Sequence, residues 1–108
     1  INLCKLYQHR REVLNDAMKR AFGDDFKRVA SDGGMHSVYT IPSEYNDKKI
    51  CELTNECGLS IRALSNYFSS NEIKQGLVIG FAGYDDMTIE SSVSLLESAI
   101  AKYLARKG

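Results

Sequence analysis

Apolar positions recur at three- and four-residue steps at both ends of the chain, and this spacing predicts a helix at each end. The first helix is expected over residues 3–22, and Gly23 directly after it is expected to end it. At 1.5 Å per residue it is about 30 Å long, so one end is expected to pack on something else. The last helix follows a capping residue, Asp85, and continues to the end of the chain. Its inner stripe consists of Ile89, Val93, Leu96 and Ile100, with Tyr103 or Leu104.

Between these helices, short apolar runs bounded by turn residues predict four strands and one further helix. The strands are expected over residues 27–30, 35–41, 59–64 and 76–83, and the helix over residues 47–57 with Asn46 as its N-cap. A turn is expected over residues 31–34. Polarity alternates along the second strand, so that Ser37 and Tyr39 face one way and Val38 the other. Ile61 and Arg62 are expected on opposite faces of the third strand.

The resulting order of elements is α-β-β-α-β-β-α. The strands are short, and the connections are too tight for several parallel crossovers. We therefore predict an α+β fold, in which a small, mostly antiparallel sheet has its helices packed on one face. The chain shows no internal repeat, low-complexity tract or linker, so residues 1–108 are interpreted as a single domain. It begins with Ile1 in a helical pattern, and we expect it to be a piece of a longer polypeptide.

Composition then narrows the class of protein. Apolar residues make up 44% and charged residues 26% of the 108 positions, which is ordinary for a globular domain. Lys+Arg and Asp+Glu both number 14, so there is no global electrostatic case for nucleic-acid or membrane binding. The three cysteines are Cys4, Cys51 and Cys57, and no Cys-x-x-Cys pair occurs, which argues against a disulfide framework or a zinc site. No apolar run approaches the roughly 20 residues that span a bilayer. A cytoplasmic location is the expectation.

Few residues are candidates for chemistry. His9 and His36 have no metal-ligand partner at helical spacing. We interpret His9 as a surface histidine and His36 as a strand-edge histidine. The glycines before His36 allow a close backbone approach, so a position facing a pocket stays open for it. Cys51 and Cys57 are interpreted as buried or half-buried thiols of one helix. No phosphate-binding glycine loop is present. We therefore predict no catalytic residue, no cofactor-binding residue and no metal site within the chain.

Two segments are candidates for the wall of a ligand pocket. Gly80 interrupts an apolar strand, which indicates a close neighbour, either a packed helix or a ligand. Aromatic residues lie in the otherwise polar segment 65–75, and loops of that composition often rim a ligand site. The candidate pocket residues are Ser65, Tyr67, Val78 and Gly80.

Four segments, taken in order, resemble a known family. They are YQHRREVL from Tyr7, GGMHSVYTIP from Gly33, CGLSIRALSNY from Cys57, and GLVIGFAGYDDMTIESSVSLLESAI from Gly76. Together they resemble the C-terminal small domain of fold-type I pyridoxal-phosphate aminotransferases. The closest likeness is to the aminotransferase-like part of MocR-type transcriptional regulators, a branch of the GntR family. The resemblance extends over nearly the whole chain.

The resemblance implies a larger parent protein. Full-length members of the family carry an N-terminal winged-helix DNA-binding domain, a linker and an aminotransferase-like region, and they form homodimers. The lysine that holds pyridoxal phosphate lies in the large domain, upstream of this chain. The expected partners are therefore the remainder of the same polypeptide and a second copy. DNA is expected to bind only through the N-terminal winged-helix domain, and no membrane partner is expected. Alone, the fragment is expected to bind no cofactor and to catalyse no transamination, whereas the parent resembles a transferase.

One family feature is missing from the sequence. Many aminotransferases place an arginine two residues before the position of Gly80, where it binds the substrate carboxylate. This chain has Val78 there, and a guanidinium binds a carboxylate far better than an aliphatic side chain does. MocR-type members often have aliphatic residues at this point, which fits effector sensing. Arg62 aligns with an arginine or similar family residue, but the resemblance assigns it no role.

Two alternatives remain open at this point. The chain could be the small domain of an ordinary cytosolic class I or II aminotransferase, which is an enzyme and not a regulator. It could also be a stand-alone α+β interaction module. A winged helix encoded upstream of Ile1 would indicate the regulator, and its absence the enzyme.

Overall fold

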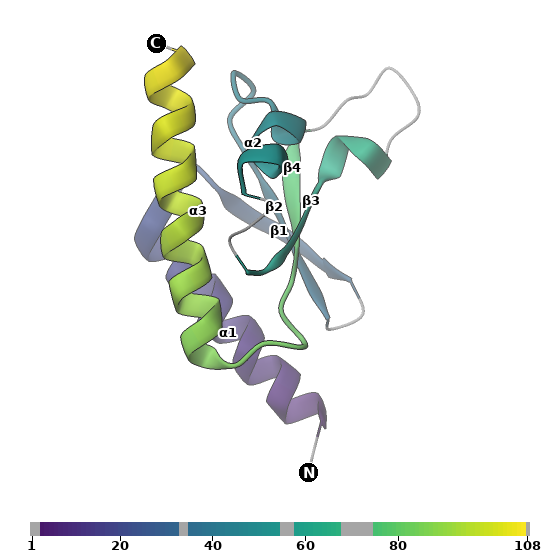
Figure 1. Ribbon diagram of the computed structural model, residues 1–108. Coiled ribbons are helices and arrows are strands. Elements are labelled where there is room, and N and C mark those ends of the chain that lie inside the picture. Colours follow the sequence, from purple (N-terminus) through teal and green to yellow (C-terminus); the bar gives the residue numbers. More distant parts are fainter. Residues whose placement is uncertain (1–2, 33–34, 55–57, 68–74, 108) are drawn as a thin grey trace.

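The computed structural model describes residues 3–32, 35–54, 58–67 and 75–107. Its elements follow the predicted order (Figure 1). They are α1 (Leu3–Phe22), β1 (Lys27–Asp32), β2 (His36–Thr40), α2 (Asp47–Leu53), β3 (Ser60–Ala63), a 3₁₀ turn η1 (Leu64–Tyr67), β4 (Gly76–Gly80) and α3 (Asp86–Lys107).

The four strands form one sheet in the order β1-β2-β4-β3, and every neighbouring pair is antiparallel. β4, the last strand in the sequence, therefore lies inside the sheet between β2 and β3. β1 and β3 are the two edge strands, and β1 carries an irregularity between Arg28 and Ala30. The predicted α+β class with an antiparallel sheet is confirmed.

The core lies on one face of this sheet. Tyr39 of β2 and Leu77 and Ile79 of β4 point into it, and all three are nearly inaccessible to solvent. The three helices cover the same face with the following buried residues: Leu14, Ala17 and Met18 of α1, Ile50 of α2, and Ile89, Val93, Leu96 and Ile100 of α3. The predicted packing of the helices on one face, and the predicted inner stripe of the last helix, are confirmed.

α1 and α3 pack against each other, and the N-terminal turns of α1 extend past the sheet (Figure 1). The buried residues of α1 all lie in its C-terminal half, whereas Leu3 is 57% exposed. Polar side chains attach α1 to the first residue of α3 and to the connection that precedes it. His9 Nε2 lies 2.6 Å from Asp86 Oδ2, and the Arg10 guanidinium donates to the carbonyl of Ala82. His9 is a surface residue, as predicted.

Side chains cap the two later helices as their sequences predict. Asn46 Oδ1 accepts a hydrogen bond from the amide of Lys49 at 3.1 Å at the start of α2. Asp85 Oδ1 accepts from the amide of Thr88 at 2.8 Å at the start of α3. Each side chain satisfies an amide that has no partner inside its helix.

Several predicted boundaries were wrong by a few residues. Ser31 and Asp32 continue β1 instead of forming a turn, and residues 33–34 lie outside the described structure. α2 ends at Leu53, and residues 55–57, including Cys57, lie outside the described part. β4 ends at Gly80, three residues earlier than predicted. The segment after β3, predicted to be irregular, begins with the η1 turn.

Candidate functional site

One face of the sheet carries no helix within the described structure. Alternate residues of a strand share a face, so the residues of β4 that do not enter the core are on this side. We call this the outer face. It comprises Gly76, Val78 and Gly80 of β4, His36, Val38 and Thr40 of β2, and Ser60 and Arg62 of β3.

The strand register arranges these residues in two complete rows. One row is formed by His36, Gly80 and Ser60, and the next by Val38, Val78 and Arg62. Directly paired residues of antiparallel strands have Cβ atoms about 5 Å apart. β4 therefore places the small or apolar residues Gly80 and Val78 between the side chains of the two flanking strands.

Gly80 has close neighbours, but they belong to the adjacent strands. A Cβ atom at this position would lie 3.3 Å from Cδ2 and 3.4 Å from Nε2 of His36, and 3.5 Å from Cβ of Ser60. The expectation of a packed helix or a ligand was incomplete, because the imidazole of His36 lies against this position. Gly80 lets this ring lie across β4.

Ser65 is buried and forms two hydrogen bonds to the same carboxylate, that of Asp47. Asp47 Oδ2 accepts from the Ser65 amide at 2.9 Å, and Asp47 Oδ1 accepts from the Ser65 hydroxyl at 2.6 Å. The same carboxylate accepts from the amide of Gly76 at 3.1 Å, and the amide of Asp47 donates to Gln75 Oε1 at 2.8 Å. Asp47 is fully buried. It therefore ties the start of α2 to η1 and to the first residue of β4.

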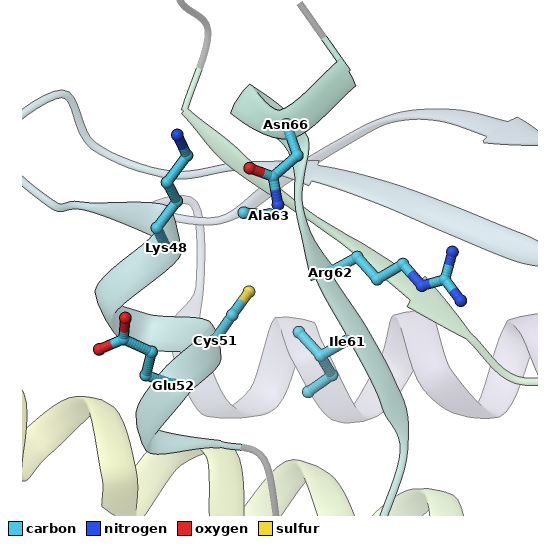
Figure 2. A pocket seen from close by; sticks show the side chains of 7 residues that line it. All are labelled: Lys48, Cys51, Glu52, Ile61, Arg62, Ala63 and Asn66. Atoms are coloured by element: carbon cyan, nitrogen blue, oxygen red, sulfur yellow. The ribbon is translucent and has the colours of Figure 1, made fainter.

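A groove of about 790 Å³ lies between α2 and the edge strand β3 (Figure 2). Its lining consists of Lys48, Cys51, Glu52, Ile61, Arg62, Ala63 and Asn66. In Figure 2, Ile61 is directed toward α2, whereas Arg62 is directed away from it. The predicted opposite facing of these two residues is confirmed. Cys51 is half-buried, as predicted.

The four predicted pocket residues are only partly brought together. Val78 and Gly80 are on the outer face, two residues apart on β4. Ser65 instead turns its hydroxyl to Asp47 and lines neither the outer face nor the groove. The backbone of Tyr67 ends η1, while its side chain lies outside what the structure describes. Their roles in a pocket stay predictions.

Sequence reasoning missed Asp47 as a connecting residue and the groove beside β3. By its position, Asp47 is an acidic residue in the first turn of a helix, where the helix dipole favours a negative charge. No local pattern indicates that its carboxylate reaches Ser65, 18 positions along the chain. The groove also has no sequence signal, because it depends on how α2 is placed beside an edge strand.

The described lysine side chains do not fit a covalent pyridoxal-phosphate site. Such a lysine is buried beside its cofactor, but every lysine whose side chain is described is exposed to solvent. These are Lys5, Lys19, Lys27, Lys48, Lys49 and Lys102. The described residues also contain no group of three histidine, cysteine or acidic side chains placed to hold a metal ion. Within the same residues, no helix is long and apolar enough to cross a membrane.

Comparison with curated proteins finds bacterial transcriptional regulators. The chain is 26% identical over 99 residues to the pyridoxine biosynthesis regulator PdxR of Corynebacterium glutamicum, an alignment that covers 92% of the chain and 21% of PdxR. It is 26% identical over 95 residues to the probable rhizopine catabolism regulator MocR of Rhizobium meliloti, covering 88% of the chain and 19% of that protein. No protein-family model matches the chain. The chain thus spans about a fifth of the length of these relatives.

Comparison with solved structures finds aminotransferases. The multiple substrate aminotransferase of Thermococcus profundus matches 94% of the chain with a TM-score of 0.78 at 20% identity. LysN, the α-aminoadipate aminotransferase of Thermus thermophilus, matches 94% with a TM-score of 0.79 at 18% identity. The chain covers 25% and 26% of these two structures. At such identities the likeness concerns the fold.

The chain therefore has the fold of an aminotransferase-like small domain. The relatives found by sequence indicate which class of protein carries a domain similar to this one. The resemblance to the aminotransferase-like part of MocR-type regulators of the GntR family is confirmed, since the transcriptional regulator PdxR and the probable regulatory protein MocR align along nearly the whole chain.

Proposed function

We propose that this chain is the single, C-terminal small domain of a pyridoxal-phosphate-dependent MocR-type regulator, and that its outer face forms part of the effector pocket. One observation carries the proposal: a regulator aligns along 92% of the chain, while the chain accounts for only 21% of that regulator. A domain of this kind depends on a larger partner to complete its site.

The distribution of packing supports a shared pocket. The helices cover one face of the sheet, so the outer face is available to a second domain. The lysines whose side chains the structure describes are all exposed, which supports placing the residue that holds the cofactor in the remainder of the polypeptide. A small domain that closes over such a site excludes water and completes the set of ligand contacts. Val78 and Gly80, with the Ser65–Tyr67 end of η1, are the proposed contributions of this chain.

The partners follow from the same proposal. The cofactor-bearing large domain contacts the outer face, two copies form a homodimer, and DNA is bound by an N-terminal domain. The chain itself has a formal net charge of +0, so it has no overall electrostatic attraction for a polyanion. We expect this fragment alone to have no transaminase activity.

A second candidate is the small domain of an aminotransferase that is not a regulator. The matches to solved aminotransferases, with TM-scores of 0.78 and 0.79, support the same fold for both candidates and do not distinguish between them. The two candidates differ in what precedes the chain. A stand-alone α+β interaction module is the third candidate, and it requires a native start near Ile1.

The coding sequence upstream of Ile1 separates these candidates. The proposal predicts a winged helix, a linker and a large domain with a buried lysine. An aminotransferase large domain without a winged helix would favour the enzyme. A start codon immediately before Ile1 would overturn both and favour the module. An electrophoretic shift of the promoter next to the gene, by the full-length product, then tests regulation directly.

A further inference from the structure

We infer that His36 and Ser60 form a polar subsite above Gly80, and that this subsite recognises a hydroxyl group of the effector. The inference rests on the proposed function, because it assigns a ligand chemistry to one row of the outer face. It concerns two side chains to which neither the fold nor the relatives give a role.

The two side chains converge over the backbone of Gly80. His36 and Ser60 are the partners of Gly80 on the two sides of β4. A Cβ atom at Gly80 would lie 3.4 Å from Nε2 of the imidazole and 3.5 Å from Cβ of Ser60. Both side chains therefore lie close to one point of the outer face, although β2 and β3 are not neighbours in the sheet. A ligand group above Gly80 can contact both.

Both side chains have hydrogen-bonding capacity that the described residues do not use. His36 and Ser60 are half-buried, and neither has a hydrogen-bond or ion-pair partner within the part of the chain that the structure describes. Asp32 is the partner of His36 on β1, and its side chain lies outside the description. Polar groups that lose water without gaining a partner are unfavourable. The pair is therefore suited to bond with a group that arrives on the outer face.

The donors and acceptors of this pair match a hydroxyl group. A neutral imidazole has one nitrogen that donates and one that accepts, and the serine hydroxyl does both. A ligand hydroxyl also donates and accepts, so it can bond to both side chains at once. A methyl group in the same place would leave both side chains unpaired, and sites built for a hydroxyl discriminate strongly on this ground.

The neighbouring row suits the carbon chain of such a ligand. Val38 and Val78 are partners two residues away from His36 and Gly80 on the same strands. Val78 is only 8% exposed and carries no charge. Positions two residues apart on a strand are separated by about 7 Å. A short aliphatic chain lying over the valines can therefore place its hydroxyl above Gly80.

The test uses the full-length gene product loaded with pyridoxal phosphate, because the proposed pocket needs the large domain. Two matched pairs of amino acids are the probes: L-serine against L-2-aminobutyrate, and L-homoserine against L-norvaline. A methyl group replaces the hydroxyl within each pair, and all four compounds carry an amine that can combine with the aldehyde of the cofactor. Isothermal titration calorimetry measures their affinities without relying on turnover. In at least one pair, the native protein should bind the hydroxyl compound about tenfold more tightly.

Variants of the two residues should reduce this preference for the hydroxyl compound. His36→Phe keeps a ring above Gly80 but removes both nitrogens, and the preference should fall to about twofold or less. His36→Gln keeps a donor and an acceptor and should retain part of it. Ser60→Ala should reduce the preference roughly threefold, whereas Ser60→Thr should preserve it because the hydroxyl remains.

The chain offers a matched control for each residue. His9→Gln removes its other histidine, on α1, and Ser94→Ala removes an exposed serine of α3. Both controls should leave the preference within about twofold of the native value.

Two results would overturn the inference while leaving the proposed function intact. One is a cofactor-loaded protein that shows no preference in either pair. The other is an equal loss of affinity for the hydroxyl and methyl compounds in His36→Phe, which would mean that His36 bonds to the large domain instead. A full-length product that binds no pyridoxal phosphate would overturn the proposed function and the inference together.

Discussion

The carboxylate of Asp47 holds Ser65 by both its amide and its hydroxyl, at 2.9 and 2.6 Å. The same side chain also accepts from the amide of Gly76. Because all three donors are buried, each would lose its partner if the carboxylate were removed. Asp47 thus connects three elements at the end of the sheet where the η1 turn begins.

Replacing Asp47 by alanine should therefore destabilise the fold strongly. Leaving buried donors unsatisfied costs about 1–3 kcal/mol each, and we expect a total loss of about 3 kcal/mol or more. Ser65→Ala removes one of the three donors and should cost about 1 kcal/mol. Urea unfolding of the two variants measures both values. If Asp47→Ala is no more damaging than Ser65→Ala, Asp47 does not connect these elements.

Gly58 is expected to tolerate no side chain. Its φ of +107° lies in a region that residues with a Cβ atom rarely adopt, and a Cβ would lie 2.7 Å from the Ser92 hydroxyl oxygen. Gly58→Ala should lower the free energy of unfolding by about 2 kcal/mol. Adding Ser92→Ala should recover the steric part only, since the backbone strain persists. Chemical denaturation of both single variants and the double variant gives this coupling, and strict additivity would contradict it.

The contact between Gly80 and the His36 ring predicts a second coupling. Gly80→Val forces the imidazole off β4 and should cost about 1–3 kcal/mol, as overpacking commonly does. The loss should be smaller in a His36→Ala background, where the ring is already absent. Thermal denaturation of the four proteins tests this. An undiminished loss in the His36→Ala background would show that the ring is not what fills the space.

Asp85, which caps α3, should make the free energy of unfolding depend on pH. Hydrogen bonds from the side chain and amide of Thr88 lower the pKa of Asp85 from its ordinary value. Its stabilisation is therefore complete above the unfolded pKa, about 3.9, and is lost as pH falls through the lower folded value. Asp85→Asn retains a capping oxygen without titrating. Melting curves should show a steeper acid loss for the native chain than for Asp85→Asn, and parallel curves would refute the assignment.

The periodic parts of the fold could be predicted from the sequence, but the contacts between distant segments could not. The spacing of Ile89, Val93 and Leu96 defines the buried face of α3 because a helix repeats every 3.6 residues. The alternation through Tyr39 gives the buried face of β2 in the same way. By contrast, the pairing of Arg62 with Val78 depends on β4 inserting between β2 and β3. That choice of neighbour leaves no local pattern in the sequence.

The candidate site shows the same limit. Gly80 signals a close approach, yet nothing in its own segment identifies His36 as the neighbour, 44 positions earlier. Ser65 lies in a segment whose composition is typical of a pocket rim, but its hydroxyl faces a buried carboxylate. Composition indicates that a residue can meet a ligand, while tertiary packing decides which way it points.

The central claim is that this chain completes a pyridoxal-phosphate site whose lysine lies elsewhere in the polypeptide. Absorbance titration with pyridoxal phosphate, performed on the full-length gene product and on the 108-residue chain, tests it most directly. We expect saturation at one cofactor per full-length polypeptide and no stoichiometric binding by the chain alone. Stoichiometric binding by the isolated chain, or none by the full-length product, would contradict the claim.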